Sequence, residues 1–525
     1  MGSIFSAIGR GINAIISAIA NVFMTIVSAI TTVIVTIFNF FDLAARDSVR
    51  DITLLMSILS HPSEDTPPPT PTRPPSSHGP SGKLPIELLS EIFLLCVEER
   101  MDEWNTIRIP LLLSKICSRW RSAAISNPIL WSRLSIQLSG AASKSMTAIV
   151  DTWLTRSGKC PLTIYVFWEE PPFSDNHIVL EKLMAHSERW KTMFFYLPYR
   201  AFKSFSSVRN RLPMLTELSL GTDDDVVLPS PSVFNPSHFD MFEIAPRLRS
   251  LECVNFSPTI LNFPWSQLED IPLLSGNITD CLDILGRGKR LSKLSVIFVQ
   301  GGPLTSPAQF PHVSHQHLTC FTIMTPPWNE VIDLSALFPR LTLPQLETLT
   351  ICNLNSTFGD KFTQFLSRLH TLKTLHLRKT ALPDDQLVEG LKHLSSLTSL
   401  IVLSSSPTHH DYPAENEPTV TRYLLEALTR NFFSENTMDG MLLPRLRRLE
   451  LTVGSSAARE TEAFIDMVQS RLRDDEEEGL ARLEHVRVRP CVDLGDEFLV
   501  RLIELRDFGL DVEVESMGNV SANVC

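Results

Sequence analysis

The sequence predicts an α/β fold in which a small helical module is followed by a solenoid of short repeats, behind a hydrophobic N-terminal helix. Three observations predict this fold. A short leucine-containing unit occurs nine times between residues 215 and 488. Between several copies, apolar residues recur at the spacing of a helix. Before the first copy lies a short segment whose apolar residues also have helical spacing. The expected divisions of the chain are residues 1–45, 46–82, 83–138, 139–516 and 517–525.

Composition limits the classes of protein to be considered. The 525 residues are 43% hydrophobic and 20% charged, which is enough to bury large cores. The net charge is −12, whereas proteins that bind nucleic acid through its phosphates are usually basic, so no nucleic-acid partner is expected. The nine cysteines form no CxxC pair and have no histidine at metal-ligand spacing. The sequence therefore predicts a cytoplasmic protein with reduced cysteines, no metal and no cofactor.

The N-terminal segment is long and apolar enough to meet a membrane. Residues 11–41 carry no charged side chain, and about 20 apolar residues span a bilayer. As one helix this segment would be about 46 Å long at 1.5 Å per residue. We predict membrane contact through residues 4–41. The alternatives are a hydrophobic helix that docks on the solenoid, or an erroneously joined exon.

The first six residues, MGSIFS, match the acceptor pattern for N-myristoylation, which makes Gly2 a lipidation candidate. A proline-rich segment then lies at residues 61–82, with eight prolines among serines and threonines. Such a composition predicts an extended, solvated linker. Its PxxP spacings leave an SH3-type ligand as the alternative.

Residues 83–138 have the spacing of a short helical module. A proline suited to a first helical turn opens KLPIELLSEIF at residues 83–93, and an apolar face continues to residue 96. A second helix is expected from 110 to about 124. Asn127 and Pro128 then look like the cap and first turn of another helix. Two or three short helices bury little apolar area, so part of this face should meet a partner or the next domain.

Three segments of this module resemble an F-box. They are LPIELLSEIF at 84–93, LLLSKICSRWR at 111–121 and PILW at 128–131, and the likeness is to the F-box-like proteins abundant in mushroom-forming fungi. The resemblance implies binding to Skp1, the adaptor of cullin–RING ubiquitin ligases. Each matching position could alternatively be plain core. The positions that match the family's Skp1 contacts or adjoining core are Pro85, Leu88, Leu89, Ile92, Leu112, Ile116 and Trp120.

The repeats share one pattern: a leucine, two variable residues, and then an apolar–x–apolar strand. Several copies are spaced 25 to 28 residues apart, which is the length of leucine-rich repeats, and longer steps indicate inserted loops. Further strands are expected at 134–138, 162–167 and 193–197. The copies are LTELSL (215–220), LRSLEC (248–253), LSKLSV (291–296), LTCFTI (318–323), LETLTI (346–351), LKTLHL (372–377), LTSLIV (397–402), LRRLEL (446–451) and LEHVRV (483–488).

Alternate residues of these strands are expected on the concave face of the solenoid, where the C-terminal part is rich in arginine. One hypothesis is that this part receives an acidic or phosphorylated segment of a client protein, because guanidinium groups suit such anions. The alternative, which the pattern favours, is that the arginines pair with acidic neighbours across strands. The predicted client-binding residues are His376, Arg378, Arg448, Glu450, Arg487 and Arg489.

No catalytic motif appears: HExxH, GxSxG, the P-loop and the dinucleotide fingerprint are all missing, so no enzyme is expected. By resemblance, the chain would be the substrate-recognition subunit of an SCF-type ubiquitin ligase, with an F-box that binds Skp1 and a leucine-rich-repeat solenoid that binds a protein client. The alternative is a membrane-attached repeat scaffold whose F-box-like helices only cap the solenoid. Exposure or coverage of the surface around Leu88, Ile92 and Trp120 discriminates between the two.

Overall fold

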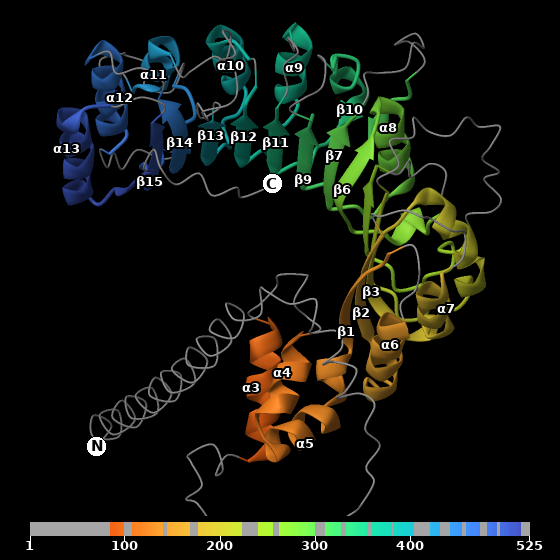
Figure 1. Cartoon of the computed structure of the whole chain (residues 1–525). Coiled ribbons are helices and arrows are strands. Elements are labelled where there is room, and N and C mark those ends of the chain that lie inside the picture. Colours follow the sequence, from red (N-terminus) through yellow and green to blue (C-terminus); the bar gives the residue numbers. More distant parts are fainter. Residues whose placement is uncertain are drawn as a thin grey trace, which may run out of the picture. The chain divides into compact units, whose positions relative to one another are not determined.

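The computed structural model is a mixed α/β protein with a large parallel sheet, and it divides into two compact units, Met1–Val208 and Arg209–Cys525 (Figure 1). No helix among the described residues is long and apolar enough to cross a membrane. The predicted membrane contact at 4–41, the candidate Gly2, the proline-rich linker and the tail 517–525 lie outside the described residues. The structure describes residues 85–98, 108–139, 144–168, 177–222, 240–255, 262–299, 310–326, 332–353, 359–380, 382–403, 421–430, 441–453, 458–472, 480–490 and 494–515.

The first unit begins with the helical module: α3 (Ile86–Glu98), α4 (Arg108–Ile116), α5 (Ser118–Ser126) and the 3-10 helix η2 (Pro128–Trp131). The expectation of one continuous helix over 110–124 was wrong. The backbone of Cys117 is extended, at φ −158° and ψ 168°, and its Sγ accepts a hydrogen bond from the Trp120 N–H at 3.5 Å. Cys117 therefore caps a new helix, although the apolar spacing runs on across it.

The module has a small aromatic core. Phe93 is fully buried and its ring lies 5.0 Å from that of Trp120. The indole N–H of Trp131 donates to the carbonyl of Ala124 at 2.8 Å. The Asn127 side chain accepts from the Ile129 N–H at 3.2 Å, which confirms the predicted cap.

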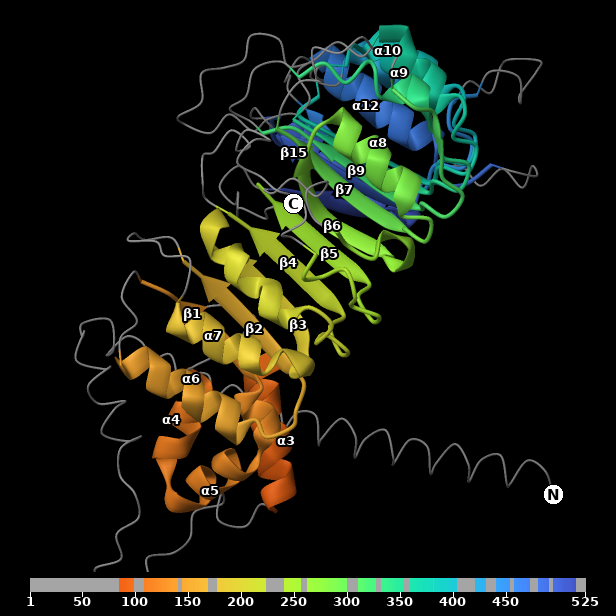
Figure 2. The same cartoon turned by 90° about the vertical axis from the view of Figure 1, so that its right-hand side faces the viewer.

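The three strands predicted after the module are present in the first unit. They are β1 (Arg133–Gln137), β2 (Leu162–Phe167) and β3 (Trp190–Tyr196), they pair in parallel in sequence order, and α6 (Lys144–Arg156) and α7 (Ile178–Ala185) connect them (Figure 2). The ring of Trp131 meets the ring of Trp153 in α6 edge-on at 4.8 Å. The module and these three strands thus belong to the same compact unit.

In the second unit, each of the nine predicted repeat copies contributes one strand, and consecutive strands pair in parallel. Two further strands of this large sheet, β6 and β16, lie outside the nine copies and were not predicted. The strands are β4 (Glu217–Gly221), β5 (Ser250–Val254), β6 (Asp270–Gly276), β7 (Lys293–Phe298), β9 (Cys320–Met324), β11 (Thr348–Cys352), β12 (Thr374–Arg378), β13 (Ser399–Leu403), β14 (Arg448–Val453), β15 (His485–Pro490) and β16 (Asp511–Val514).

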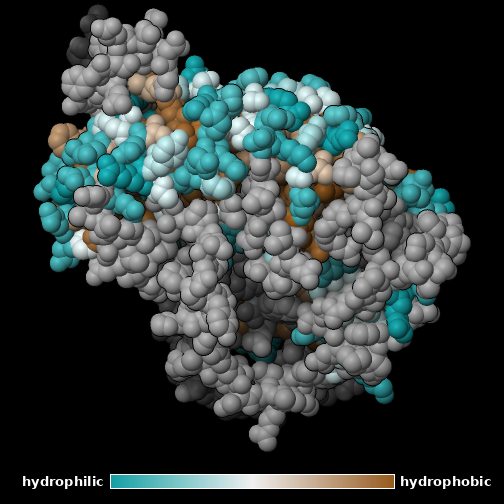
Figure 3. Space-filling model, turned by 90° about the horizontal axis from the view of Figure 1, so that it is seen from above, coloured by the Kyte–Doolittle hydropathy of each residue, from teal (hydrophilic) through white to brown (hydrophobic). Residues whose placement is uncertain are grey.

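Helices cover one face of this sheet (Figure 1), and their outer surface is largely hydrophilic (Figure 3). The opposite face, which we call the helix-free face, is formed by strand residues alone among the described residues. A short second sheet pairs β8 (Val313–Ser314) with β10 (Leu341–Thr342). The helices are α8 (Ile278–Arg287), α9 (Gly359–Leu366), α10 (Asp384–Leu391), α11 (Arg422–Leu428), α12 (Ala458–Ser470) and α13 (Asp496–Glu504).

The core of the second unit is a row of stacked leucines. Leu349, Leu375, Leu400 and Leu449 occupy the same register in β11 to β14 and are all fully buried. Alternation within each strand sends these residues toward the helices and their neighbours to the helix-free face. The predicted apolar pattern of the repeat is confirmed at these positions.

Arg471 lies inside this core. Arg471, 1% exposed, donates to the carbonyls of Leu428, Leu442 and Leu443 at 2.7, 2.7 and 3.0 Å. Burial, together with the charge of Arg430, lowers the pKa of Arg471 to about 9. The guanidinium thus links the last residue of α11 to the segment just before β14.

We predict that Arg471→Met lowers the free energy of unfolding by about 2–4 kcal/mol, because three buried carbonyls lose their donor. Arg422→Met is the matched control: Arg422 is exposed and pairs with exposed Glu426, so a change of less than about 0.5 kcal/mol is expected. Urea unfolding followed by circular dichroism measures both. Equal effects of the two substitutions would contradict this role of Arg471.

A buried histidine predicts acid sensitivity. The Nδ1 of His315 accepts from the Leu318 N–H at 3.0 Å, and its Nε2 lies 2.8 Å from the Gly288 carbonyl, which suits the neutral ring. Burial lowers the pKa of His315 below its ordinary 6.5. The unfolded chain therefore binds more protons than the folded chain as the pH falls through about 6.5. Stability contributed by neutral His315 is complete above that pH and is lost below it.

We expect the urea midpoint of the wild type to fall between pH 7.5 and pH 5.5, and to fall less in His315→Asn. The asparagine keeps an acceptor for the backbone and does not titrate. An identical pH dependence of the two proteins would show that His315 does not carry this linkage.

Candidate functional site

The helical module presents apolar side chains to solvent. Among the predicted contact residues, Leu88 is 40% and Ile116 is 51% exposed, and Pro85 is exposed as well. Ile92, Leu112 and Trp120 are half-buried, whereas Leu89 is fully buried and belongs to the core of the module. The predicted set therefore divides into an outer surface and one inner residue.

Helix α3 explains this division, because it is apolar on two sides. Leu89, Phe93, Cys96 and Val97 recur at helical spacing and are buried. Leu88, Ile92 and Leu95 form a second row, at spacings of four, three and seven residues, on the outer side. A helix that is apolar nearly all round is normally buried on all sides. The outer row of α3 is therefore a surface that lacks a cover within the described residues.

Further apolar residues of the module are exposed and were missed from the sequence. They are Ile86 and Leu95 in α3, Ile125 in α5 and Ile129 in η2. Together with Leu88 and Ile116 we call these the module surface. The sequence shows these four as apolar residues outside the helical apolar spacing of the module. The prediction of the binding side used only the residues with that spacing.

A groove runs beside α5. It has a volume of about 380 Å³ and is lined by Ser118, Arg121, Ser122, Ile125 and Ser126. The Arg121 Nε donates to the Ser114 carbonyl at 2.9 Å, which holds its side chain along the module. The groove thus adds hydroxyl groups and one cation beside the apolar module surface.

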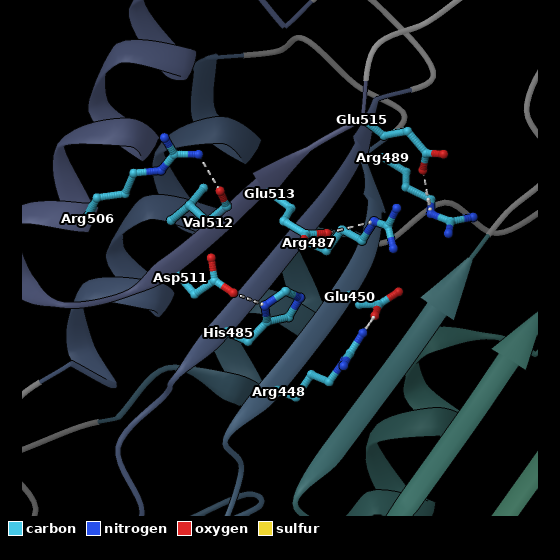
Figure 4. Close-up of polar contacts among 10 residues, drawn as sticks. All are labelled: Arg448, Glu450, His485, Arg487, Arg489, Arg506, Asp511, Val512, Glu513 and Glu515. Atoms are coloured by element: carbon cyan, nitrogen blue, oxygen red, sulfur yellow. Dashed lines mark hydrogen bonds and ion pairs between the residues drawn. The ribbon is translucent and has the colours of Figure 1, made fainter. Parts of the chain in front are cut away.

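The predicted client-binding residues lie together on the helix-free face of β12, β14 and β15. Three of these arginines form ion pairs: Arg448 with Glu450, Arg487 with Glu513 at 3.4 Å, and Arg489 with Glu515 at 2.8 Å (Figure 4). The Arg487 pair crosses between strands and the Arg489 pair reaches the residue that follows β16, as the favoured alternative of the sequence analysis expected, whereas Arg448 and Glu450 lie in the same strand. Three guanidinium groups face three carboxylates, so an acidic client would have to compete with intramolecular partners.

His376 and Arg378 lie on the same face, in β12, and both are half-buried. Burial lowers the pKa of His376, opposed by the charge of Glu450 and reinforced by the charges of Arg378 and Arg489. Its buried Nε2 has no hydrogen-bond partner among the described residues. His376 is therefore a neutral, partly buried ring at physiological pH.

One group of side chains offers ligands for a metal ion. The ligand atoms of His485, Asp511 and Glu513 lie within 4.8 Å of one another, the one such group in the part of the chain that the structure describes. However, His485 Nδ1 is 2.8 Å from Asp511, and Glu513 pairs with Arg487. A cation would have to break both contacts and meet the positive charge of Arg487, so this arrangement favours a salt-bridge network.

No family model matches this chain, and no curated protein matches it. The likeness of residues 84–131 to an F-box therefore depends on those residues themselves.

We predict that Arg448→Leu lowers the free energy of unfolding by about 1–3 kcal/mol, because it leaves the buried carboxylate of Glu450 without its cation. The neighbouring Arg447 pairs with Glu484, and both of these side chains are more than half exposed. Arg447→Leu is therefore expected to change stability by less than about 0.5 kcal/mol. Thermal unfolding of the two variants makes the comparison; a larger loss in Arg447→Leu would contradict it.

Proposed function

We propose that this chain is the substrate-recognition subunit of an SCF-type ubiquitin ligase. The helical module, residues 83–138, acts as the F-box and binds Skp1 through the module surface. The second unit, read as a leucine-rich-repeat solenoid, holds a protein client. The chain itself makes and breaks no bond; it raises the effective concentration of the client at the ligase.

The observation that carries this proposal is the exposure of the module surface. Leu88 and Ile116 match family positions for Skp1 contact, and they are among the exposed large apolar side chains. A contiguous exposed apolar patch marks an interaction site, and we propose that Leu88 and Ile116 belong to one such patch. In the alternative function, a membrane-attached scaffold, the same helices cap the solenoid and these residues should be covered. Of the three residues that discriminate between the two functions, Leu88 is exposed, whereas Ile92 and Trp120 are half-buried. The exposure of Leu88, together with that of Ile116, supports the ligase function.

The client is proposed to bind on the helix-free face near His376, Arg378, Arg448, Glu450, Arg487 and Arg489. Because three of the arginines already have carboxylate partners, shape and hydrogen bonding should select the client more than net charge does. Reversal of Arg448 and Arg487 to Glu would test any dependence on an acidic client. The protein is proposed to act in the cytoplasm.

We predict that the full chain co-purifies with fungal Skp1 in equal amounts, and that the double variant Leu88→Asp, Ile116→Asp loses at least about 100-fold in affinity. Two buried apolar contacts lose roughly 1.5–3 kcal/mol each and two carboxylates are desolvated. Ile244→Asp is the matched control, because Ile244 is also 51% exposed but lies outside the module. Both variants should keep the circular dichroism spectrum of the wild type.

Absence of Skp1 binding by the folded wild type would reject the ligase function and favour the scaffold. Equal loss in Ile244→Asp would show that the effect is not specific to the module surface.

A further inference from the structure

The last described strand, β16, forms an outer edge of the parallel sheet. It pairs with β15 on one side, and no strand among the described residues pairs with its other side. The N–H groups of Asp511 and Glu515 donate to the Glu484 and Val488 carbonyls at 2.9 and 3.1 Å. Alternate residues of a parallel strand turn their backbone groups to opposite neighbours. The backbone N–H and C=O groups of Val512 and Val514 therefore point to the outer edge.

One backbone group at this edge is held by a side chain. The Arg506 Nη2 donates to the Val512 carbonyl at 2.5 Å, as Figure 4 shows. A backbone N–H of a further strand would donate to this same carbonyl. The guanidinium thus occupies the place of one main-chain donor of an additional strand.

The two faces of β16 differ in chemistry. On the helix-free face, Asp511 is 69% exposed and Glu513 is about half exposed, although each has a partner in β15. A carboxylate accepts several hydrogen bonds, so these oxygens can also receive a cationic group from the outer side. The edge therefore presents the carboxylates of Asp511 and Glu513, two residues apart, to the outer side.

On the other face, the last repeat keeps apolar side chains in solvent. Phe508, just before β16, is 63% exposed, and Val500, Ile503 and Val514 are also exposed. The inner side of α13 is packed, since Phe498 lies 5.8 Å from Phe464 in α12. In a stacked array each unit covers the apolar side of the one before it. No described residue covers the apolar side of the last repeat.

We propose that the outer edge of β16 is a docking site for an extended segment of a partner protein in which Lys or Arg alternates with Val, Ile or Leu. Its backbone would pair with Val512 and Val514, replacing Arg506. Its basic side chains would meet Asp511 and Glu513, and its apolar ones would pack against the exposed apolar side. Strand addition of this kind obtains affinity from main-chain hydrogen bonds and selectivity from alternate side chains.

A second copy of the chain is a poorer occupant of this edge. A two-fold pairing of β16 with itself would bring the acidic side chains of one copy against those of the other, and like charges across strands are destabilising. The proposed partner has the complementary charge. The site is separate from the module surface, so it does not depend on Skp1 binding.

The probe is a fluorescein-labelled heptapeptide, Lys-Val-Lys-Val-Lys-Val-Lys, titrated with the full chain and followed by anisotropy. One control peptide has the same composition with its lysines grouped together. A second has the alternating sequence with N-methyl groups on alternate residues, which removes main-chain donors. We expect both controls to bind at least about 10-fold more weakly, as loss of register or of about two hydrogen bonds implies.

Protein variants locate the site. The double variant Asp511→Lys, Glu513→Lys should weaken binding of the alternating peptide by at least about 10-fold. The matched double variant Glu389→Lys, Glu426→Lys makes the same charge change at exposed helix positions and should weaken it by less than about threefold. Arg506→Met should tighten binding about threefold to tenfold, because one backbone acceptor becomes free.

Equal binding of the three peptides would overturn the proposal, as would equal losses in the two charge-reversal variants. If the alternating peptide does not bind the wild-type chain, the proposal is overturned. This holds even if the peptide binds a chain that lacks residues 516–525. An unchanged or lower affinity in Arg506→Met would contradict the place assigned to that guanidinium.

Discussion

The second unit depends on one interaction, the burial of the same leucine of each repeat against its counterpart in the next. Leu375, for example, is aligned with Leu349 on one side and Leu400 on the other, and all three are fully buried. No single repeat can bury this side chain by itself, so each repeat is stable only between neighbours. Replacing such a leucine with alanine typically costs about 2–5 kcal/mol. The two faces of the sheet, and the positions of the charged strand residues on its helix-free face, follow from this alignment.

Stacking also explains why both candidate surfaces lie at the ends of compact units. A unit inside a stacked array has its apolar surface covered by the units on both sides. A unit at an end of the array has one apolar side without such a neighbour. The module keeps Leu88 and Ile116 in solvent in the first unit, and the last repeat keeps Phe508 and Val514 in solvent in the second. Apolar surface at an end either meets a cap or meets a partner. The acidic side chains of β16 limit which partners can approach that edge.

Much of the fold could be predicted from local pattern, and what could not be predicted depends on distant contacts. Period-two apolar residues after a leucine predict strands, and nine such strands are present. The break at Cys117 was missed because its extended backbone interrupts an unbroken apolar spacing. The burial of Arg471 was not predicted, because its three carbonyl partners come from distant parts of the chain. The pairing of Arg487 with Glu513 requires β16, a strand too short to be recognised beforehand.

The most direct test of the account is amide hydrogen exchange of the full chain with and without fungal Skp1. The account predicts slower exchange in α3, α4 and α5, whose outer sides carry Leu88, Ile116 and Ile125, and unchanged exchange in β12 to β16. That result would place Skp1 on the module surface and leave the helix-free face available for a client. Slower exchange in β12 to β16 with an unchanged module, or no change anywhere, would contradict it.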